Sequence, residues 1–197
     1  MSKIVVIEHL TLDGVMQSPG LPDEDTRDGF EYGGWAEAGN DPVMMKVQSK
    51  YMSSSWSLLV GRTTYEGLAN AWKDQSRDQS IAKALSNVEK FVASTTMVEP
   101  LPWENSILLK GNIPETVAQL KKEHNKTIVI FGSGELVQSL MQHDLIDEYV
   151  LMIHPLVLGK GRRLFLGDGS LAHLKLVDSV TTDTGVIIAT YRTVLEQ

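Results

Sequence analysis

The sequence predicts an α/β fold with a largely parallel central sheet. Short runs of β-branched and apolar residues alternate with amphipathic stretches along most of the 197 residues, which is typical of strands that alternate with helices. After Pro155 the alternation stops, and two last strands, at about 174–180 and 185–191, are joined by a turn around Thr182-Asp183. These two strands predict an antiparallel hairpin that finishes the sheet.

Six short strands and five helices are expected before that hairpin. The strands span residues 3–7, 56–60, 90–93, 106–109, 127–131 and 148–153. The helices run from Asp41-Pro42 to Tyr51, from the turn at 61–64 to about Ala71, and over residues 80–85, 114–124 and 136–142. Asp41 can cap the free amides of the first helix, and Pro42 suits its first position. Residues 11–40 form a long irregular segment, and such a segment inside a compact domain is usually functional or mobile.

The composition is that of an acidic globular protein. Lys plus Arg (18) against Asp plus Glu (25) gives a net charge of −7, which argues against nucleic acid or an anionic membrane as the main partner. The absence of cysteine excludes disulfides and thiolate metal sites, and we expect no metal centre. No apolar run approaches the length of a membrane span. We therefore expect one cytoplasmic domain over residues 1–197, acting on a small molecule.

The most informative segment, residues 127–145, is a buried strand that opens through a glycine-rich turn into an amphipathic helix. Gly132 and Gly134 let a ligand approach the main chain, and the helix that starts near Glu135 attracts anions with its free amides and dipole. The pattern predicts a phosphate-binding turn. It is weak alone, because a full dinucleotide fingerprint needs a third glycine and usually lies in the first strand-helix unit.

Two further strand ends carry groups that suit phosphates. Residues 61–63 place a guanidinium and a hydroxyl at a helix N-terminus, and residues 94–96 place three hydroxyl groups after a strand. Because parallel strands deliver their carboxyl ends to one edge, we expect these junctions to converge with the glycine turn. Each junction alone is equally typical of a helix cap with a solvated arginine or of ordinary turn chemistry.

The order of these motifs resembles the dihydrofolate-reductase-like superfamily, and specifically stand-alone relatives of the reductase domain of the bifunctional riboflavin-biosynthesis deaminase-reductase. The resemblance rests on five stretches: Thr11-Leu12-Asp13-Gly14; residues 61–66, GRTTYE; residues 94–96, STT; residues 132–136, GSGEL, with residues 145–149, LIDEY; and residues 154–161, HPLVLGKG. It implies a three-layer α/β/α fold, NADPH as cofactor and a homodimer in which the C-terminal hairpin is a plausible contact.

The resemblance also implies a set of cofactor contacts. The pyrophosphate would meet Gly61, Arg62 and Thr63. The adenosine ribose and its 2′-phosphate would meet Ser94 and Thr95. The nicotinamide half would meet Gly132, Ser133, Gly134 and Glu135.

The substrate side departs from the family. Riboflavin-pathway reductases carry a lysine on the first strand where this chain has Ile7, and a glutamate before paired glycines where it has Phe131. The second of those glycines is Ser133 here. A dihydrofolate reductase would need a carboxylate in its first helix, for which Asp41 is a loose candidate. The substrate is therefore less well indicated than the cofactor.

Asp13 is the preferred catalytic candidate, because it follows the first strand at the expected binding edge. It would donate a proton or orient the substrate, although Leu-Asp-Gly is also a common turn. Trp35 is a candidate to stack on a flat substrate, or else it packs the long loop down. His9 is a lesser candidate, and Arg162-Arg163 is interpreted as a solvated loop face.

Two functions remain open at this stage. The first is an NADPH-dependent reductase of a small heterocycle, most like 5-amino-6-(5-phosphoribosylamino)uracil reductase or dihydrofolate reductase. The alternative is a non-catalytic nucleotide-binding or regulatory protein that keeps the cofactor site and has lost the substrate-side charges.

Overall fold

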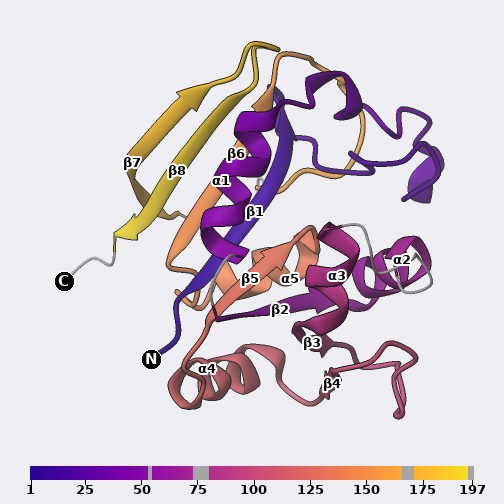
Figure 1. Cartoon of the computed structure of the whole chain (residues 1–197), viewed down its shortest axis with the longest axis vertical. Coiled ribbons are helices and arrows are strands. Elements are labelled where there is room, and N and C mark those ends of the chain that lie inside the picture. The colour runs from indigo at the N-terminus through magenta and orange to yellow at the C-terminus, as the bar shows by residue number, and fades with distance from the viewer. Residues whose placement is uncertain (53–54, 73–79, 166–170, 195–197) are drawn as a thin grey trace.

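One eight-stranded sheet runs through the protein (Figure 1). The computed structural model describes residues 1–52, 55–72, 80–165 and 171–194. The strands are β1 (Ile4–Thr11), β2 (Trp56–Gly61), β3 (Glu89–Ala93), β4 (Ser106–Leu109), β5 (Thr127–Phe131), β6 (Glu148–His154), β7 (His173–Thr181) and β8 (Ile187–Val194). The helices are α1 (Pro42–Met52), α2 (Arg62–Trp72), α3 (Ser80–Asn87), α4 (Ile113–Glu123) and α5 (Gly134–Met141).

The strand order is β4-β3-β2-β5-β1-β6-β8-β7. The first six strands in this order, from β4 at the edge to β6, are all parallel to one another. Their carboxyl ends therefore lie at one edge of the sheet. β5 is inserted between β1 and β2, although it comes much later in the chain. This order places the loops that follow β1, β2 and β5 next to one another, as ligand sites in open α/β sheets require.

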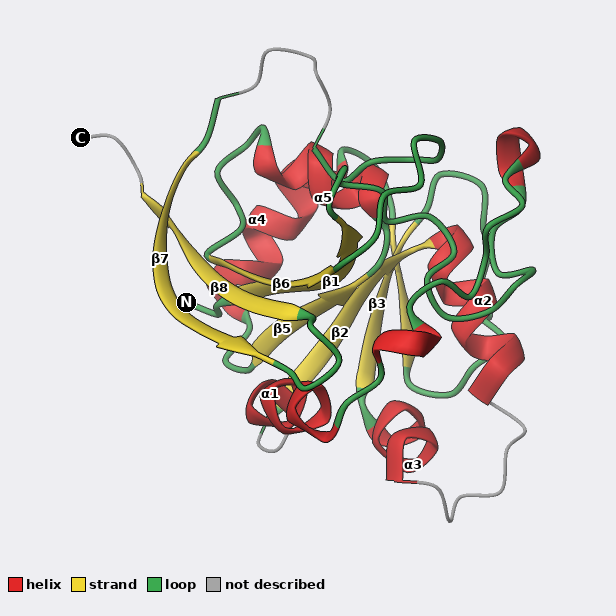
Figure 2. Ribbon diagram, turned by 90° about the horizontal axis from the view of Figure 1, so that it is seen from above, coloured by secondary structure: helices red, strands yellow, loops and turns green. Residues whose placement is uncertain are grey.

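Helices cover both faces of the sheet (Figure 2). On β1, Val5 and Ile7 face one cluster of buried side chains, to which α1, α2 and α3 contribute. Ile4 and Val6 face the opposite cluster, to which α4 and α5 contribute. The alternation follows from the two-residue period of a strand, and it confirms the three-layer α/β/α fold.

The predicted C-terminal hairpin is also confirmed. β8 pairs antiparallel with β6 and with β7, and the β7–β8 register shifts between Leu176 and Asp178. The largest boundary difference is in β1, which extends to Thr11 instead of ending at Ile7. Glu8 and His9 break the apolar run in the sequence, but the β6 ladder continues past them to the pair Thr11–His154. Among the described helices, none is long and apolar enough to cross a membrane.

Candidate active site

The three predicted junctions lie together at the carboxyl edge of the parallel strands. The loop after β2 begins α2 at Arg62, the loop after β5 begins α5 at Gly134, and β3, which ends at Ala93, pairs with β2. Gly61 is aligned with Ala93 in that ladder. The parallel register therefore brings together segments that are 30 to 70 residues apart in the chain, as the sequence predicted.

Ser133 joins two of these junctions directly. Its Oγ accepts a hydrogen bond from the Gly61 amide at 2.9 Å and donates one to Thr64 Oγ1 at 2.8 Å. Thr64 belongs to the first turn of α2, and Ser133 immediately precedes α5. The amino ends of the two helices are thus fixed side by side, and their free amides and dipoles both favour an anion placed there.

The glycine turn is shaped for close approach. Gly132 has φ of +56° and Ser133 of +64°, so the chain reverses through two left-handed residues before α5. A Cβ on Gly134 would lie 2.5 Å from Met16 Sδ, so any larger residue here would require the Met16 side chain of the long loop to move. Left-handed backbone of this kind, with small side chains, fits a pyrophosphate or a nicotinamide ring.

Charges at the site are arranged in pairs. The Arg62 guanidinium lies 3.1 Å from Glu66 and is about half exposed, so it remains available to a phosphate. Glu135, at the start of α5, would repel a phosphate, but Arg162 contacts it at 2.6 Å. Arg162 also contacts Asp28 in the long loop at 3.2 Å. Arg162 is thus a partly solvated loop residue, as predicted, and it also connects the long loop to α5.

The Ser94–Thr96 segment forms a tight turn after β3. Ser94 Oγ accepts hydrogen bonds from the amides of Thr96 (3.1 Å) and Met97 (3.0 Å), and its side chain is buried. This hydroxyl is thus committed to the turn. Thr95 and Thr96 are exposed, so their hydroxyls are open to a ligand.

Asp13 holds two chain segments together. Its carboxylate accepts hydrogen bonds from Thr11 Oγ1 (2.6 Å) and from the amides of Leu158 (3.2 Å) and Gly159 (2.9 Å), and it lies 3.3 Å from Arg163. The bond from Thr11 is the main cause that lowers the pKa of Asp13 to about 2. A carboxylate with this pKa is ionised at neutral pH, which suits an anchor better than a proton donor.

The two substrate-side candidates lie in different surroundings. Asp41 caps α1 by accepting a hydrogen bond from the Val43 amide at 2.8 Å, and it also accepts one from the amide of Asp183 in the hairpin at 3.2 Å. Trp35 donates from Nε1 to the Gln17 carbonyl at 2.8 Å, and the edge of its ring meets His154 with the centroids 5.3 Å apart. Trp35 therefore packs within the long loop and at the same time borders the end of β6.

His154 is a polar residue of this edge that the sequence left unassigned. His9 Nδ1 and His154 Nε2 are 2.9 Å apart, and their rings lie on the face of the sheet that α1 covers. The signal was present in the strand period, which places His9 on the same face as Ile7. The pairing with His154 depends on the β1–β6 register, which one sequence does not reveal.

Glu8 was also missed. It points to the opposite face from His9, is 3% exposed, and its Oε2 has no hydrogen-bond partner. It follows Ile7, which is paired with Phe131, so it lies beside Gly132. Burial raises the pKa of Glu8 to about 8, so this carboxyl is mostly protonated at neutral pH.

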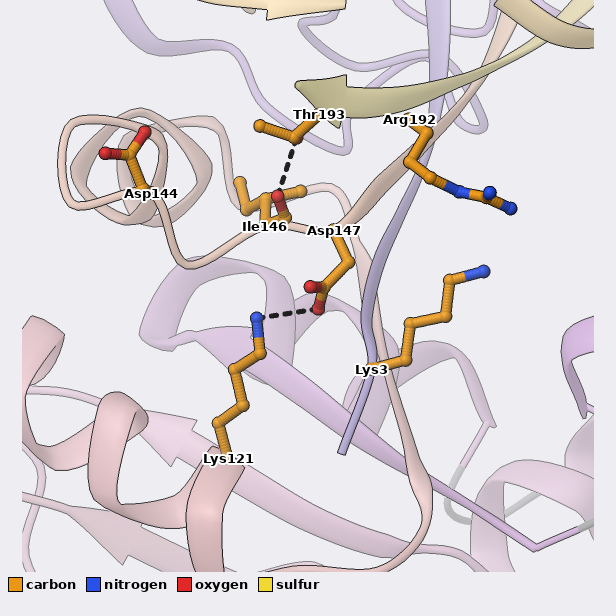
Figure 3. A pocket seen from close by; sticks show the side chains of 7 residues that line it. All are labelled: Lys3, Lys121, Asp144, Ile146, Asp147, Arg192 and Thr193. Atoms are coloured by element: carbon orange, nitrogen blue, oxygen red, sulfur yellow. Dashed lines mark hydrogen bonds and ion pairs between the residues drawn. The ribbon is translucent and has the colours of Figure 1, made fainter. Parts of the chain in front are cut away.

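A surface cavity of about 430 Å³ lies at the opposite, amino edge of the sheet (Figure 3). It is lined by Lys3, Lys121, Asp144, Ile146, Asp147, Arg192 and Thr193. Its lysines already have carboxylate partners, because Lys121 lies 2.7 Å from Asp147 and Lys3 lies 2.6 Å from Glu148. The cavity includes none of the predicted site residues and is a poor site for an anionic cofactor.

Comparison with known proteins agrees with this architecture. The family model of the RibD C-terminal domain matches residues 2–188. YyaP, an uncharacterized protein of Bacillus subtilis (strain 168), is 33% identical over 119 residues, which cover 60% of this chain and 62% of YyaP. The match thus spans less than two thirds of that relative.

Solved structures share the fold. A protein of Shewanella sp. PV-4 that is named for riboflavin biosynthesis has a TM-score of 0.74 at 23% identity, over 98% of this chain and 99% of the other. Dihydrofolate reductase from Enterococcus faecalis, complexed with NADP(H), has a TM-score of 0.59 at 17% identity, over 97% of this chain and 96% of the other. The fold is therefore dihydrofolate-reductase-like.

The region matched by the family model contains every candidate site residue described above and strands β1 to β7, and it ends within the first residues of β8. The motif order that suggested the resemblance is thus supported along nearly the whole chain. The chain belongs to the RibD C-terminal domain family.

Proposed function

We propose that this protein is an NADPH-dependent reductase of a small heterocyclic compound. The observation that carries the proposal is the Ser133 bridge, which fixes the amino ends of α2 and α5 side by side at the carboxyl edge of the sheet. Two adjacent helix N-termini, with Arg62 on one of them, fit the two phosphates of a dinucleotide.

The chain's own residues would bind and orient the cofactor. Gly61, Arg62 and Thr63 would hold the pyrophosphate, and the exposed Thr95 hydroxyl would lie toward the adenosine ribose. Gly132 and Gly134 would allow the nicotinamide half to approach the main chain. NADPH would supply the hydride, and the protein must place an electrophilic C=N or C=O carbon of the substrate against it.

Asp13 has a supporting role in this proposal. Its low pKa and its contacts with Leu158 and Gly159 suit a carboxylate that fixes the long loop over the site. The proton that follows the hydride then comes from solvent or from another group of the site. We further propose that the enzyme acts in the cytoplasm as a homodimer.

Titration of the purified protein with NADPH and with NADH, followed by nicotinamide fluorescence, tests the cofactor. We expect saturable binding with a preference for NADPH, and about tenfold weaker binding for Arg62→Ala, because one charge-assisted contact is lost. Lys122→Ala, which removes an exposed charge from α4, is the matched control and should leave affinity unchanged. If neither cofactor binds, the proposal is wrong.

Turnover separates the reductase from a non-catalytic nucleotide-binding protein. The ribosylaminopyrimidine substrate of riboflavin synthesis and dihydrofolate are each added to the NADPH complex, and consumption of NADPH is followed. Steady oxidation with either compound establishes a reductase. Tight NADPH binding without consumption of the cofactor favours the non-catalytic alternative, which rests on Ile7 and Phe131 in place of charged residues.

A further inference from the structure

The cavity at the amino edge of the sheet is built by four segments that lie far apart in the chain (Figure 3). They are the residues just before β1, the end of α4, the connection from α5 to β6, and the end of β8. Backbone hydrogen bonds join three of them, because Asp147 N donates to the Ile4 carbonyl at 3.0 Å and Thr193 N donates to the Asp147 carbonyl at 3.1 Å. The walls are therefore fixed by the fold itself, and the volume of about 430 Å³ is that of a small-molecule site.

The polar groups in the middle of the cavity are matched to one another. Asp147 Oδ2 accepts a hydrogen bond from the Ile4 amide at 2.8 Å and lies 2.7 Å from the Lys121 ammonium. Thr193 Oγ1 donates to the Ile146 carbonyl at 2.7 Å. The middle of the cavity is thus a neutral, fixed surface.

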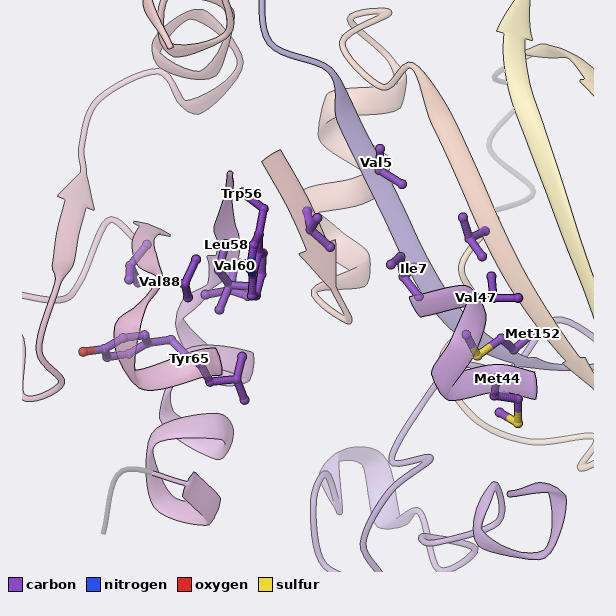
Figure 4. Close-up of a cluster of buried hydrophobic side chains, with 14 of the residues drawn as sticks. Val5, Ile7, Met44, Val47, Trp56, Leu58, Val60, Tyr65, Val88 and Met152 are labelled. Carbon is purple, nitrogen blue, oxygen red and sulfur yellow. The ribbon is translucent and has the colours of Figure 1, made fainter. Parts of the chain in front are cut away.

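One end of the cavity carries a surplus positive charge. Lys3 comes two residues before Val5, so the strand period places it on the face where Val5 packs beneath α1 (Figure 4). On that face Lys3 Nζ lies 2.6 Å from Glu148 Oε2, and Arg192 lies 3.7 Å from the same oxygen. The other Glu148 oxygen accepts a hydrogen bond from Tyr51. One carboxylate therefore serves two cations, and Arg192, whose side chain is 60% exposed, is the more loosely held.

Asp144 supplies the opposite charge at the other end. It lies in the connection after α5, is exposed, and has φ of +54°. Its carboxylate has no ion pair or hydrogen bond with any other residue that the structure describes. Figure 3 shows Asp144 and Arg192 on opposite sides of the cavity, with Ile146 and Asp147 between them. The cavity is therefore balanced in total charge but negative at one end and positive at the other.

We propose that this cavity binds a small zwitterion whose ammonium and carboxylate groups are separated by several bonds, such as an ω-amino acid or a short peptide. The carboxylate would lie on the Arg192 guanidinium and the ammonium on Asp144, with the connecting chain over the neutral middle. A ligand with one charge would leave the group at the other end without a partner. The cavity lies at the edge of the sheet opposite the candidate active site, so the inference does not rest on the proposed function.

The test is a titration of the full-length ¹⁵N-labelled protein near pH 7, followed by the backbone amide resonances of residues 144–147 and 192–193. The probes are the long zwitterions 6-aminohexanoate and triglycine, the short zwitterion glycine, and the singly charged hexanoate and hexylamine. We expect at least one long zwitterion to give saturable shifts, and glycine, hexanoate and hexylamine to bind at least about fivefold more weakly. The stronger of the two long probes tells an ω-amino acid from a peptide.

Variants at the two ends give an independent measure. Asp144→Asn removes the charge and keeps a side chain that tolerates left-handed backbone, and it should weaken zwitterion binding about fivefold. Arg192→Gln should weaken it about tenfold, because a charge-assisted contact is lost. The matched controls are Asp23→Asn and Lys122→Gln, which change exposed groups outside the cavity and should leave binding unchanged.

Three results would overturn the inference: neither long zwitterion shifts the cavity resonances, a singly charged probe or glycine binds as tightly as the long zwitterions, or either end variant binds them as well as the original protein. The amide spectrum of each variant verifies its fold. If Arg192→Gln does not fold, Asp144→Asn and the probe series decide the question. Failure of NADPH to bind would remove the proposed function and leave this inference standing.

Discussion

Ser133 combines a strained backbone with two useful hydrogen bonds. Its φ of +64° is costly for a residue other than glycine, and its hydroxyl holds Gly61 and Thr64. We expect Ser133→Ala to lower the free energy of unfolding by about 2 kcal/mol, because the bonds are lost and the strain stays. Ser133→Gly should cost only about 1 kcal/mol, because glycine relieves the strain.

Urea unfolding of the two variants measures this difference. The comparison is matched, because both substitutions remove the same hydroxyl group. A larger loss for Ser133→Gly than for Ser133→Ala would show that the left-handed backbone is not strained here.

Glu8 gives a prediction about pH. Its pKa is raised from 4.5 to about 8 in the folded protein, so between these values the folded state holds a proton that the unfolded chain releases. The contribution of protonated Glu8 to the free energy of unfolding is fully present below about pH 4.5, and it is lost as the pH rises toward 8. We expect Glu8→Gln, which is similar in shape and uncharged, to be more stable than the original by about 4 kcal/mol near pH 8 and about equal near pH 4.5.

Chemical denaturation at a series of pH values tests this expectation, with the exposed Glu31→Gln as control. Identical pH slopes for the original protein and Glu8→Gln would mean that the Glu8 carboxyl ionises normally in the folded state.

At the scale of elements, the long loop is attached to the segment after β6. Besides the Asp13 contacts, Met16 N donates to Arg162 O at 2.9 Å, and Leu164 N donates to Gly14 O at 3.1 Å. We expect Asp13→Asn to weaken this attachment by about 1–2 kcal/mol, because charge-assisted bonds become neutral ones. Amide hydrogen exchange at residues 14–17 and 158–164 should accelerate together.

Asp23→Asn, an exposed change in the same loop, is the control and should leave exchange unchanged. The carboxylate of Asp13 stabilises the fold above its ordinary pKa, so in the original protein this contribution should be lost only as the pH falls toward about 2. Exchange that accelerates in the loop alone would show that Asp13 does not couple the two segments.

The elements themselves were largely predictable, whereas the contacts between distant loops were not. Strands such as β4 and β5 have the predicted limits, because apolar runs and turn residues are local signals. The bonds from the amides of Leu158 and Gly159 to Asp13 are not local: they span about 145 residues and use backbone amides, which every residue type supplies. The His9–His154 pair likewise depends on which strands are neighbours.

At the scale of the whole molecule, the hairpin presents apolar side chains on the edge strand β7 and on its neighbour β8. Leu176 and Val180 of β7 are 51% and 37% exposed, and Ile187 of β8 is 43% exposed. An open edge with such residues favours pairing with a second copy. We expect light scattering after size exclusion to give twice the 21.8 kDa chain mass, and the double variant Leu176→Lys/Val180→Lys to give the monomer mass.

Val98→Lys, which changes an exposed apolar residue outside the hairpin, should remain dimeric. A monomeric original protein would exclude the homodimer. A dimeric double variant would place the contact elsewhere.

The insertion of β5 between β1 and β2 has a consequence for synthesis. When the ribosome has released residues 1–111, β1 and β2 have been made, but the strand that belongs between them has not. The edges of β1 and β2 that pair with β5 stay open until Phe131 emerges. Open strand edges of this kind lead nascent chains to aggregate or to engage chaperones. The strand that carries the glycine turn thus also joins β1 to the β2-β3-β4 half of the sheet, so the candidate site and the continuous parallel sheet beneath it form at the same stage of synthesis.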